Sequence, residues 1–210
     1  MLTLWKAGVD WLHQTKIAMA HETTKATKRR RREEVEGGFA WSKIFVGRGI
    51  DVGPENDLLP VEGVIGFDQA QGNAEKLDEY FPSDHFDYLH ASQCLEHMRD
   101  PRCAILRWIR IVKPKGYLVI TVPDIGAFER LNYPSRWNPD HRSSWSTIYL
   151  GSSFPIHIFL PQFYLELEPL VECVLSRYVE VNYNWKEPHR DQTWPATGAE
   201  TWNEFVLRKK

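Results

Sequence analysis

The segment Gly49-Ile50-Asp51-Val52-Gly53-Pro54-Glu55-Asn56 carries the strongest fold signal in this sequence. A short apolar run ends in a carboxylate and continues into a glycine turn, which is typical of a buried strand whose carboxyl end faces a nucleotide-like ligand. Glycine suits such a turn because it lets backbone amides approach the ligand closely. The glycines at 47, 49 and 53 do not follow the G-x-G-x-x-G spacing, so a dinucleotide site is not predicted.

A second carboxylate stands at the end of the next apolar run, where Asp68 follows Val64-Ile65-Gly66-Phe67. A carboxylate in this place offers two acceptor oxygens to the hydroxyl pair of a ribose. Either acid alone would more often be a turn or cap residue. Because Asp51 and Asp68 end successive runs, we interpret them together as part of the site for a ribose-bearing ligand.

Apolar runs and helical patterns alternate through the rest of the chain, which is typical of an α/β domain with a mostly parallel sheet. One helix is predicted after Asp100-Pro101, a cap followed by a first-turn proline. A second helical pattern, over residues 161–175, contains Pro169, which predicts a kink or two short pieces. The remaining strands are predicted at residues 86–91, 117–122, 178–185 and 202–208.

The composition is that of one globular domain. Of the 210 residues, 42% are hydrophobic and 13% are aromatic, too many core-forming side chains for a disordered chain. The net charge of -2 gives no overall field that favours nucleic acid or an anionic membrane. Three cysteines without C-x-x-C spacing argue against a disulfide framework and predict a reducing, cytoplasmic setting. No apolar stretch is long enough to predict a membrane span or a secretory signal.

Residues 1–40 differ from the rest and are interpreted as an N-terminal helical extension. They contain the basic run Lys25 to Arg32, which acids follow directly. We favour a charged helix face over a nucleic-acid contact, because these acids neutralise much of the field of the run. Residues 41–210 are predicted to form the main domain. Within it, residues 124–158 read as an irregular loop, and a loop of this length is expected to carry substrate contacts.

Residues 47–124 resemble the successive motifs of class I S-adenosylmethionine-dependent methyltransferases. The matching segments are Ile-Asp-Val-Gly (50–53), Gly-Phe-Asp (66–68), Gly-Asn-Ala-Glu-Lys-Leu (72–77), Phe-Asp-Tyr-Leu-His-Ala-Ser-Gln-Cys-Leu-Glu-His (86–97) and Val-Lys-Pro-Lys-Gly-Tyr-Leu (112–118). The remainder is similar to a bacterial and phage subgroup with type 11-like methyltransferase domains.

The resemblance implies a Rossmann-like fold of the α/β class. This fold has a mostly parallel twisted sheet, an antiparallel last strand and helices on both faces. Only four residues separate Asp68 from Asn73. The helix and the third strand that usually lie between these two positions are therefore expected to be nearly absent, which leaves a trimmed sheet edge.

The resemblance also implies S-adenosylmethionine as the cofactor and S-adenosylhomocysteine as the product. The residues it assigns to the cofactor are Asp51, Gly53 and the backbone of Ser92 (methionine part), Asp68 (ribose), and Asn73 and Ala74 (adenine). Glu55 replaces the last glycine of the usual Asp-x-Gly-x-Gly motif and is expected to place an anionic group near the methionine carboxylate. Asn73 replaces the usual aspartate, and its amide oxygen is expected to accept from the adenine amino group without charge assistance.

Methyl transfer requires alignment of a nucleophile opposite the sulfonium, and a general base helps when the acceptor is a hydroxyl. The candidates for this base are His97, Asp124 and His141. Arg136 and Asn138, with His141, are candidates for orienting a polar acceptor such as a sugar or a carboxylate. No metal site is predicted, because His85, His90 and His97 have a poor spacing for zinc ligands.

The predicted function is methyl transfer from S-adenosylmethionine to an oxygen or nitrogen atom of a small molecule or glycan precursor, without a nucleic-acid or membrane partner. Two alternatives remain open. A catalytically silent cofactor-binding module is suggested by Glu55 in place of glycine. An RNA or protein methyltransferase is suggested by the basic run Lys25 to Arg32.

Overall fold

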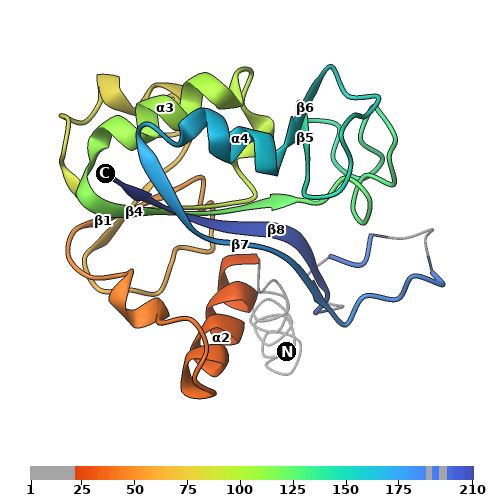
Figure 1. Ribbon diagram of the computed structural model, residues 1–210, viewed down its shortest axis with the longest axis horizontal. Helices are drawn as coiled ribbons and strands as arrows, with labels where there is room; N and C mark the ends of the chain where they lie inside the picture. The colour runs from red at the N-terminus through yellow and green to blue at the C-terminus, as the bar shows by residue number, and fades with distance from the viewer. Residues whose placement is uncertain (1–21, 188–190, 194–197) are drawn as a thin grey trace, which may run out of the picture.

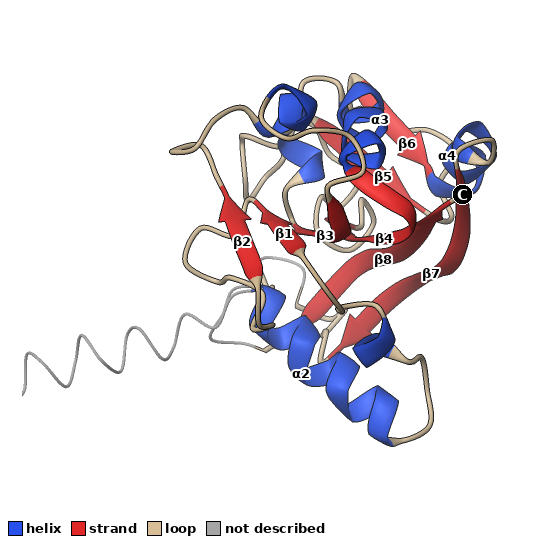
Figure 2. Ribbon diagram, turned by 90° about the vertical axis from the view of Figure 1, so that its left-hand side faces the viewer, coloured by secondary structure: helices blue, strands red, loops and turns tan. Residues whose placement is uncertain are grey.

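The computed structural model describes residues 22–187, 191–193 and 198–210. Its centre is a six-stranded sheet in the order β2-β1-β3-β4-β8-β7. The strands are β1 (Gly49–Val52), β2 (Val64–Phe67), β3 (Phe86–Ser92), β4 (Val112–Pro123), β7 (Val171–Val181) and β8 (Glu200–Lys209). Helices α3 (Pro101–Ile111) and α4 (Leu160–Leu167) cover one face, and α2 (Glu22–Val35) covers the other (Figures 1 and 2).

The strand directions confirm the predicted fold class. Strands β1, β2, β3 and β4 are parallel, while β8 runs antiparallel to β4 and to β7. The trimmed edge is confirmed as well, since β2 is the outermost strand beside β1. The chain passes from β2 through a turn into the short 3-10 helix η2 (Ala74–Glu79) and then into β3. None of the described helices is long and apolar enough to cross a membrane.

Helix α3 begins where the sequence predicts. The side chain of Asp100 accepts a hydrogen bond from the amide of Cys103 at 2.9 Å, and Pro101 occupies the first turn. The apolar stripe of this helix, with Ile105, Trp108 and Ile109, is buried on the sheet. The helix therefore closes the core above β3 and β4.

The helical prediction for residues 161–175 is wrong in its second half. Helix α4 ends at Leu167, before Pro169, and β7 begins at Val171. A proline ends a helix, and an apolar run of only a few residues does not distinguish helix from strand. Pairing with β8, where Val171 faces Lys209, makes this run a strand.

The segment 124–158 is less irregular than predicted. It contains β5 (Ser143–Ser146), which pairs in parallel with β6 (Ile156–Phe159) in a separate two-stranded sheet. Trp145 of β5 is fully buried in the main core, against Phe163 and Phe205. Burial of this large ring fixes the segment on the domain.

Helix α2 packs against the sheet as part of the domain. Arg29 and Arg30, from the basic run, are almost fully buried. Their guanidinium groups bind the carboxylate of Glu204 in β8 at 2.8–2.9 Å. The basic run is therefore partly buried. The prediction of a charged helix face exposed to solvent is wrong for Arg29 and Arg30. Residues 1–21 of the predicted extension lie outside the described residues.

Candidate functional site

Two adjoining cavities open at the carboxyl ends of the parallel strands. The first, called the edge cavity, has a volume of about 610 Å³ and lies beyond β2 and β1. The second, called the central cavity, has a volume of about 290 Å³ and lies beyond β1, β3 and β4. The ends of β1 and β3 flank the point where the strand order reverses, which is where open α/β sheets bind ligands. Five residues line both cavities: Gly53, Glu55, Gln93, His97 and Asn138.

The turn after β1 is built around Gly53. Its φ angle is +71°, and a Cβ atom there would lie 2.6 Å from Sγ of Cys94. Its amide donates to the carbonyl of Phe67 at 2.9 Å. Glycine is required here for two reasons, the left-handed backbone and the close approach of the neighbouring loop.

Asp68 is in the predicted place at the end of β2 and lines the edge cavity. Its Oδ2 accepts from the amide of Glu55 at 2.8 Å, and its Oδ1 accepts from the amide of Gln69 at 2.7 Å. An ionised carboxylate has about four acceptor positions, so both oxygens keep capacity for a ligand. Glu55 also keeps the backbone of the glycine that it replaces, with φ of +46°.

Asn73 and Ala74 line the edge cavity together with Asp68. The side-chain oxygen of Asn73 accepts from the amide of Glu75 at 2.9 Å and caps η2. An amide oxygen has two lone pairs, so this oxygen keeps capacity to accept from the adenine amino group, and that contact stays a prediction. The amide NH₂ of Asn73 adds two donors.

Asp51 does not line either cavity among the described residues, and its contact with the cofactor stays a prediction. It is 1% exposed, and its Oδ2 accepts from the amide of Leu59 at 2.7 Å. Its Oδ1 bonds Nδ1 of His90 at 2.7 Å, and Nε2 of His90 lies 3.2 Å from the Arg30 guanidinium. The carboxylate thus holds the chain after the glycine turn and ties it to helix α2.

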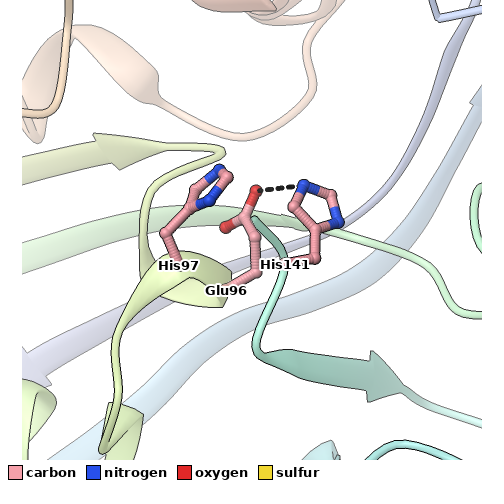
Figure 3. A group of neighbouring side chains, drawn as sticks. All are labelled: Glu96, His97 and His141. Carbon is pink, nitrogen blue, oxygen red and sulfur yellow. Dashed lines mark ion pairs between the residues drawn. The ribbon is translucent and has the colours of Figure 1, made fainter. Parts of the chain in front are cut away.

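The three side chains of Figure 3 meet at the edge of the central cavity. Glu96, in the short helix η3 (Leu95–His97), is fully buried, and its two carboxylate oxygens have no hydrogen-bond partner among the described residues. Nε2 of His141 lies 4.0 Å from Oε1 of Glu96. Burial raises the pKa of Glu96 to about 8. Sequence reasoning missed Glu96, although the Leu-Glu-His motif contains it.

Both histidines are held through Nδ1. Nδ1 of His141 lies 2.5 Å from Glu129, a buried carboxylate, and Nδ1 of His97 lies 3.3 Å from the carbonyl of Asp140. Burial and the neighbouring His141 lower the pKa of His97 to about 4. Burial alone would lower the pKa of His141, but the bond with Glu129 and the charge of Glu96 outweigh it and raise this pKa. The structure brings these two predicted residues together.

Two other predicted residues lie elsewhere. Asp124 lines neither cavity among the described residues: it accepts from the amides of Gly126 and Ala127 and from the Asn203 side chain. It caps the turn after β4, and its role as a base stays a prediction. Arg136 is exposed, with its guanidinium 5.4 Å from the ring centre of Trp137, and it also lines neither cavity.

Ser92 and Asn138 both line a cavity, and their roles in binding the cofactor and the acceptor stay predictions. Ser92, the last residue of β3, lines the central cavity, and its hydroxyl lies 3.0 Å from that of Thr121. Asn138 lines both cavities, and its side-chain oxygen accepts from the amide of Asp140. Asn138 therefore stands where the two cavities meet.

The lining of the central cavity is strongly acidic. Five carboxylate residues line it, and within the described part of the chain it contains no lysine or arginine. Aromatic rings supply the apolar wall. The acids are Glu22, Glu55, Asp57, Glu96 and Asp191, and the aromatic residues are Phe128, Trp137 and Trp202. This cavity therefore favours a cation or a neutral polar molecule over an anion.

The profile of a methyltransferase domain family matches residues 17–154, more than half of the chain. The chain belongs to this methyltransferase family. A curated relative is the ubiquinone/menaquinone biosynthesis C-methyltransferase UbiE of Vibrio campbellii (strain ATCC BAA-1116). It is 37% identical over 65 residues, which cover 30% of this chain and 24% of the relative. The similarity thus spans about a quarter of the length of that protein.

Solved structures share the fold of this methyltransferase at low sequence identity. A SAM-dependent methyltransferase from Archaeoglobus fulgidus has a TM-score of 0.55 and 17% identity, with 95% of this chain and 99% of that chain covered. One from Methanosarcina mazei has a TM-score of 0.51 and 14% identity, with 81% and 97% covered. These similarities show the class I methyltransferase fold.

S-adenosylmethionine is the cofactor of this methyltransferase. The edge cavity suits its adenosyl part, because the carboxylate of Asp68 and the amide of Asn73 line it. Gly53 lines both cavities, and a Cβ atom at this position would clash with Cys94. Without a side chain, the backbone of Gly53 is accessible to the cofactor. Carboxylates also line the central cavity, and they suit a sulfonium charge.

Gly53→Ala is expected to lower the free energy of unfolding by about 1–3 kcal/mol, because it combines a left-handed backbone with a steric clash. The turn should also shift and weaken cofactor binding. Thermal unfolding and calorimetric titration with S-adenosylmethionine measure the two effects. Gly151→Ala is the matched control, since a Cβ atom added at Gly151 would have no neighbouring atom within 4 Å. Equal stability of the two variants would contradict this role of Gly53.

Proposed function

We propose that this methyltransferase transfers the methyl group to an oxygen or nitrogen atom of a neutral or cationic small molecule or glycan precursor. The observation that carries this proposal is the central cavity, which is lined by five Asp or Glu side chains and, among the described residues, by no lysine or arginine. An anionic acceptor would meet repulsion there. The volume of about 290 Å³ suits a small molecule.

Bound S-adenosylmethionine supplies an activated methyl group and a neutral thioether leaving group. Asp68 holds the ribose hydroxyls, and the turn at Gly53 places backbone amides at the junction of the two cavities. The central cavity would hold the acceptor atom, whose lone pair would form the bond to the methyl carbon while the carbon–sulfur electron pair left with the thioether. An ammonium acceptor must lose a proton before this attack, because its nitrogen has no lone pair, and a hydroxyl acceptor must lose its proton as the bond forms. His97 and His141 line this cavity and promote the loss of that proton.

Glu55 does not support a silent binding module. Its side chain is exposed, and its amide binds Asp68 as a glycine amide would. An RNA or protein acceptor is also disfavoured, because Arg29 and Arg30 of the basic run are buried in ion pairs with Glu204. UbiE, the curated relative, is named for C-methylation in quinone biosynthesis, which is also a small-molecule reaction.

The test is methyl transfer from labelled S-adenosylmethionine to a metabolite extract separated by charge. Labelled product is expected in the neutral and cationic fractions, because acids line the acceptor cavity. The Asp68→Ala variant is the control, because any labelling that it still produces does not depend on the cofactor site. Product only in the anionic fraction, or only on RNA or protein, would contradict the proposed acceptor class.

A further inference from the structure

We propose that Glu96, His97 and His141 bind a divalent transition-metal ion at the edge of the central cavity. These residues are the only described group of three or more His, Cys, Asp or Glu side chains close enough to hold a metal ion. Metal binding itself does not depend on the proposed function. The role of the ion in activating the methyl acceptor does rest on the proposed function.

The ligand atoms are already near one another. One atom from each of the three residues lies within 4.8 Å of the other two. Metal–ligand distances of about 2.0–2.2 Å place neighbouring ligand atoms about 3–3.5 Å apart. The three side chains therefore need to close by about 1–2 Å, a movement that side-chain rotation supplies. Two imidazoles with one carboxylate form a set that holds zinc at catalytic sites.

The contacts around the histidines orient them as ligands. In both rings Nδ1 is occupied, in His141 by the Glu129 carboxylate and in His97 by the Asp140 carbonyl. When the rings are neutral, each Nδ1 therefore carries the proton, and Nε2 is the atom that can bind a metal. Metal-binding histidines are typically held in this way, through a carboxylate or carbonyl on the other nitrogen. Nε2 of His141 faces Glu96 at 4.0 Å (Figure 3).

Glu96 supplies an independent reason for a cation. Its side chain is fully buried, and neither oxygen has a hydrogen-bond partner among the described residues. A buried carboxylate without a partner is costly. No lysine or arginine lines this cavity in the described ranges, and the nearest group that can carry a positive charge is His141, whose Nε2 lies 4.0 Å from Oε1 of Glu96, beyond hydrogen-bond distance. A divalent ion would satisfy both oxygens and the two free imidazole nitrogens.

The position of the cluster gives the ion a role in the proposed reaction. All three residues line the central cavity, beside Ser92 and Gly53. Three protein ligands leave coordination positions open toward that cavity. An acceptor with a hydroxyl or amine group, able to bind a metal, is therefore the substrate class that fits. The ion would lower the pKa of that group, so the histidines would promote proton loss through the metal.

The test uses the full chain, freed of metal with a chelator and then titrated with Co²⁺ and with Zn²⁺. One Co²⁺ per chain is expected, with visible absorption bands, and Zn²⁺ should displace it. Glu96→Gln and His141→Ala should abolish this binding, and Glu129→Gln should weaken it about 10–100-fold. His85→Ala is the matched control, because His85 lies outside both cavities and its ring contacts Arg48.

Binding of the adenosyl ligand distinguishes a failure of the metal site from a failure of the proposed function. Glu96 and His141 do not line the edge cavity, so both variants should still bind the uncharged product S-adenosylhomocysteine through its adenosyl part, which also reports that they fold. Absence of a Co²⁺ spectrum in the wild-type protein, or a spectrum that survives Glu96→Gln and His141→Ala, would overturn the metal site. Metal binding without any methyl transfer would leave the site standing and contradict the proposed function instead.

Discussion

Glu204→Gln is expected to lower the free energy of unfolding by about 3–5 kcal/mol, the cost of breaking a buried ion pair. Glu204 is fully buried in β8 and binds three guanidinium groups, those of Arg29, Arg30 and Arg177. Glutamine keeps the shape but loses the charge. Arg29 retains Glu200, whereas Arg30 has no other carboxylate partner in the described structure.

Denaturant unfolding measures this loss. Glu168→Gln is the matched control, since it removes an exposed ion pair with Lys210 and should change stability by less than about 1 kcal/mol. A loss of similar size in both variants would show that the buried network does not hold helix α2 on the sheet.

The same network makes stability depend on pH. Burial alone would raise the pKa of Glu204, but the charges of Arg30 and Arg29 outweigh it and lower this pKa to about 2. A lowered folded-state pKa stabilises the protein above the unfolded value of 4.5. This contribution should fall away as the pH drops from about 4.5 to about 2. In Glu204→Gln this part of the acid sensitivity should be missing.

Asp68→Ala is expected to weaken S-adenosylmethionine binding about 100-fold or more. A hydrogen bond to a charged group contributes about 1.5–3 kcal/mol, and the carboxylate can accept from both ribose hydroxyls. The substitution also frees the amide of Glu55 from Oδ2, so the turn after β1 loses a support. Calorimetric titration gives the dissociation constant.

Two variants define the controls for Asp68. Asp68→Asn keeps the size and one acceptor oxygen, so its affinity should lie between those of the wild type and Asp68→Ala. Asp84→Ala removes an exposed carboxylate that pairs with Lys209, and it should leave the affinity unchanged. An Asp68→Ala protein that binds the cofactor as tightly as Asp84→Ala would remove Asp68 from the cofactor site.

Local patterns in the sequence predicted the parts of the fold that depend on near neighbours. The cap at Asp100 and the short spacing between Asp68 and Asn73 are examples, because capping and chain length act within a few residues. The second half of the pattern over residues 161–175 was misread, because its strand pairing depends on residues some 30 positions later.

The sequence predicted the candidate site only in part as well. The order of the motifs pointed to Asp68 and His97, and the irregular loop pointed to His141; the structure places all three at the two cavities. Asp51 and Asp124 stand at strand ends as expected, but their carboxylates bind backbone amides and other side chains. Glu96 was missed because burial without a partner is invisible in a sequence.

The amino-acid sequence alone was sufficient to give the family and the strand ends that carry its motifs, since these follow from short runs of residues. Only the tertiary structure showed which strand-end acids face a cavity, and that His141 meets Glu96 and His97. The physical reason is that the environment of a buried polar group depends on partners brought close by folding. Glu204 with Arg30, and Glu96 with His141, are such partners, and both lie far apart along the chain.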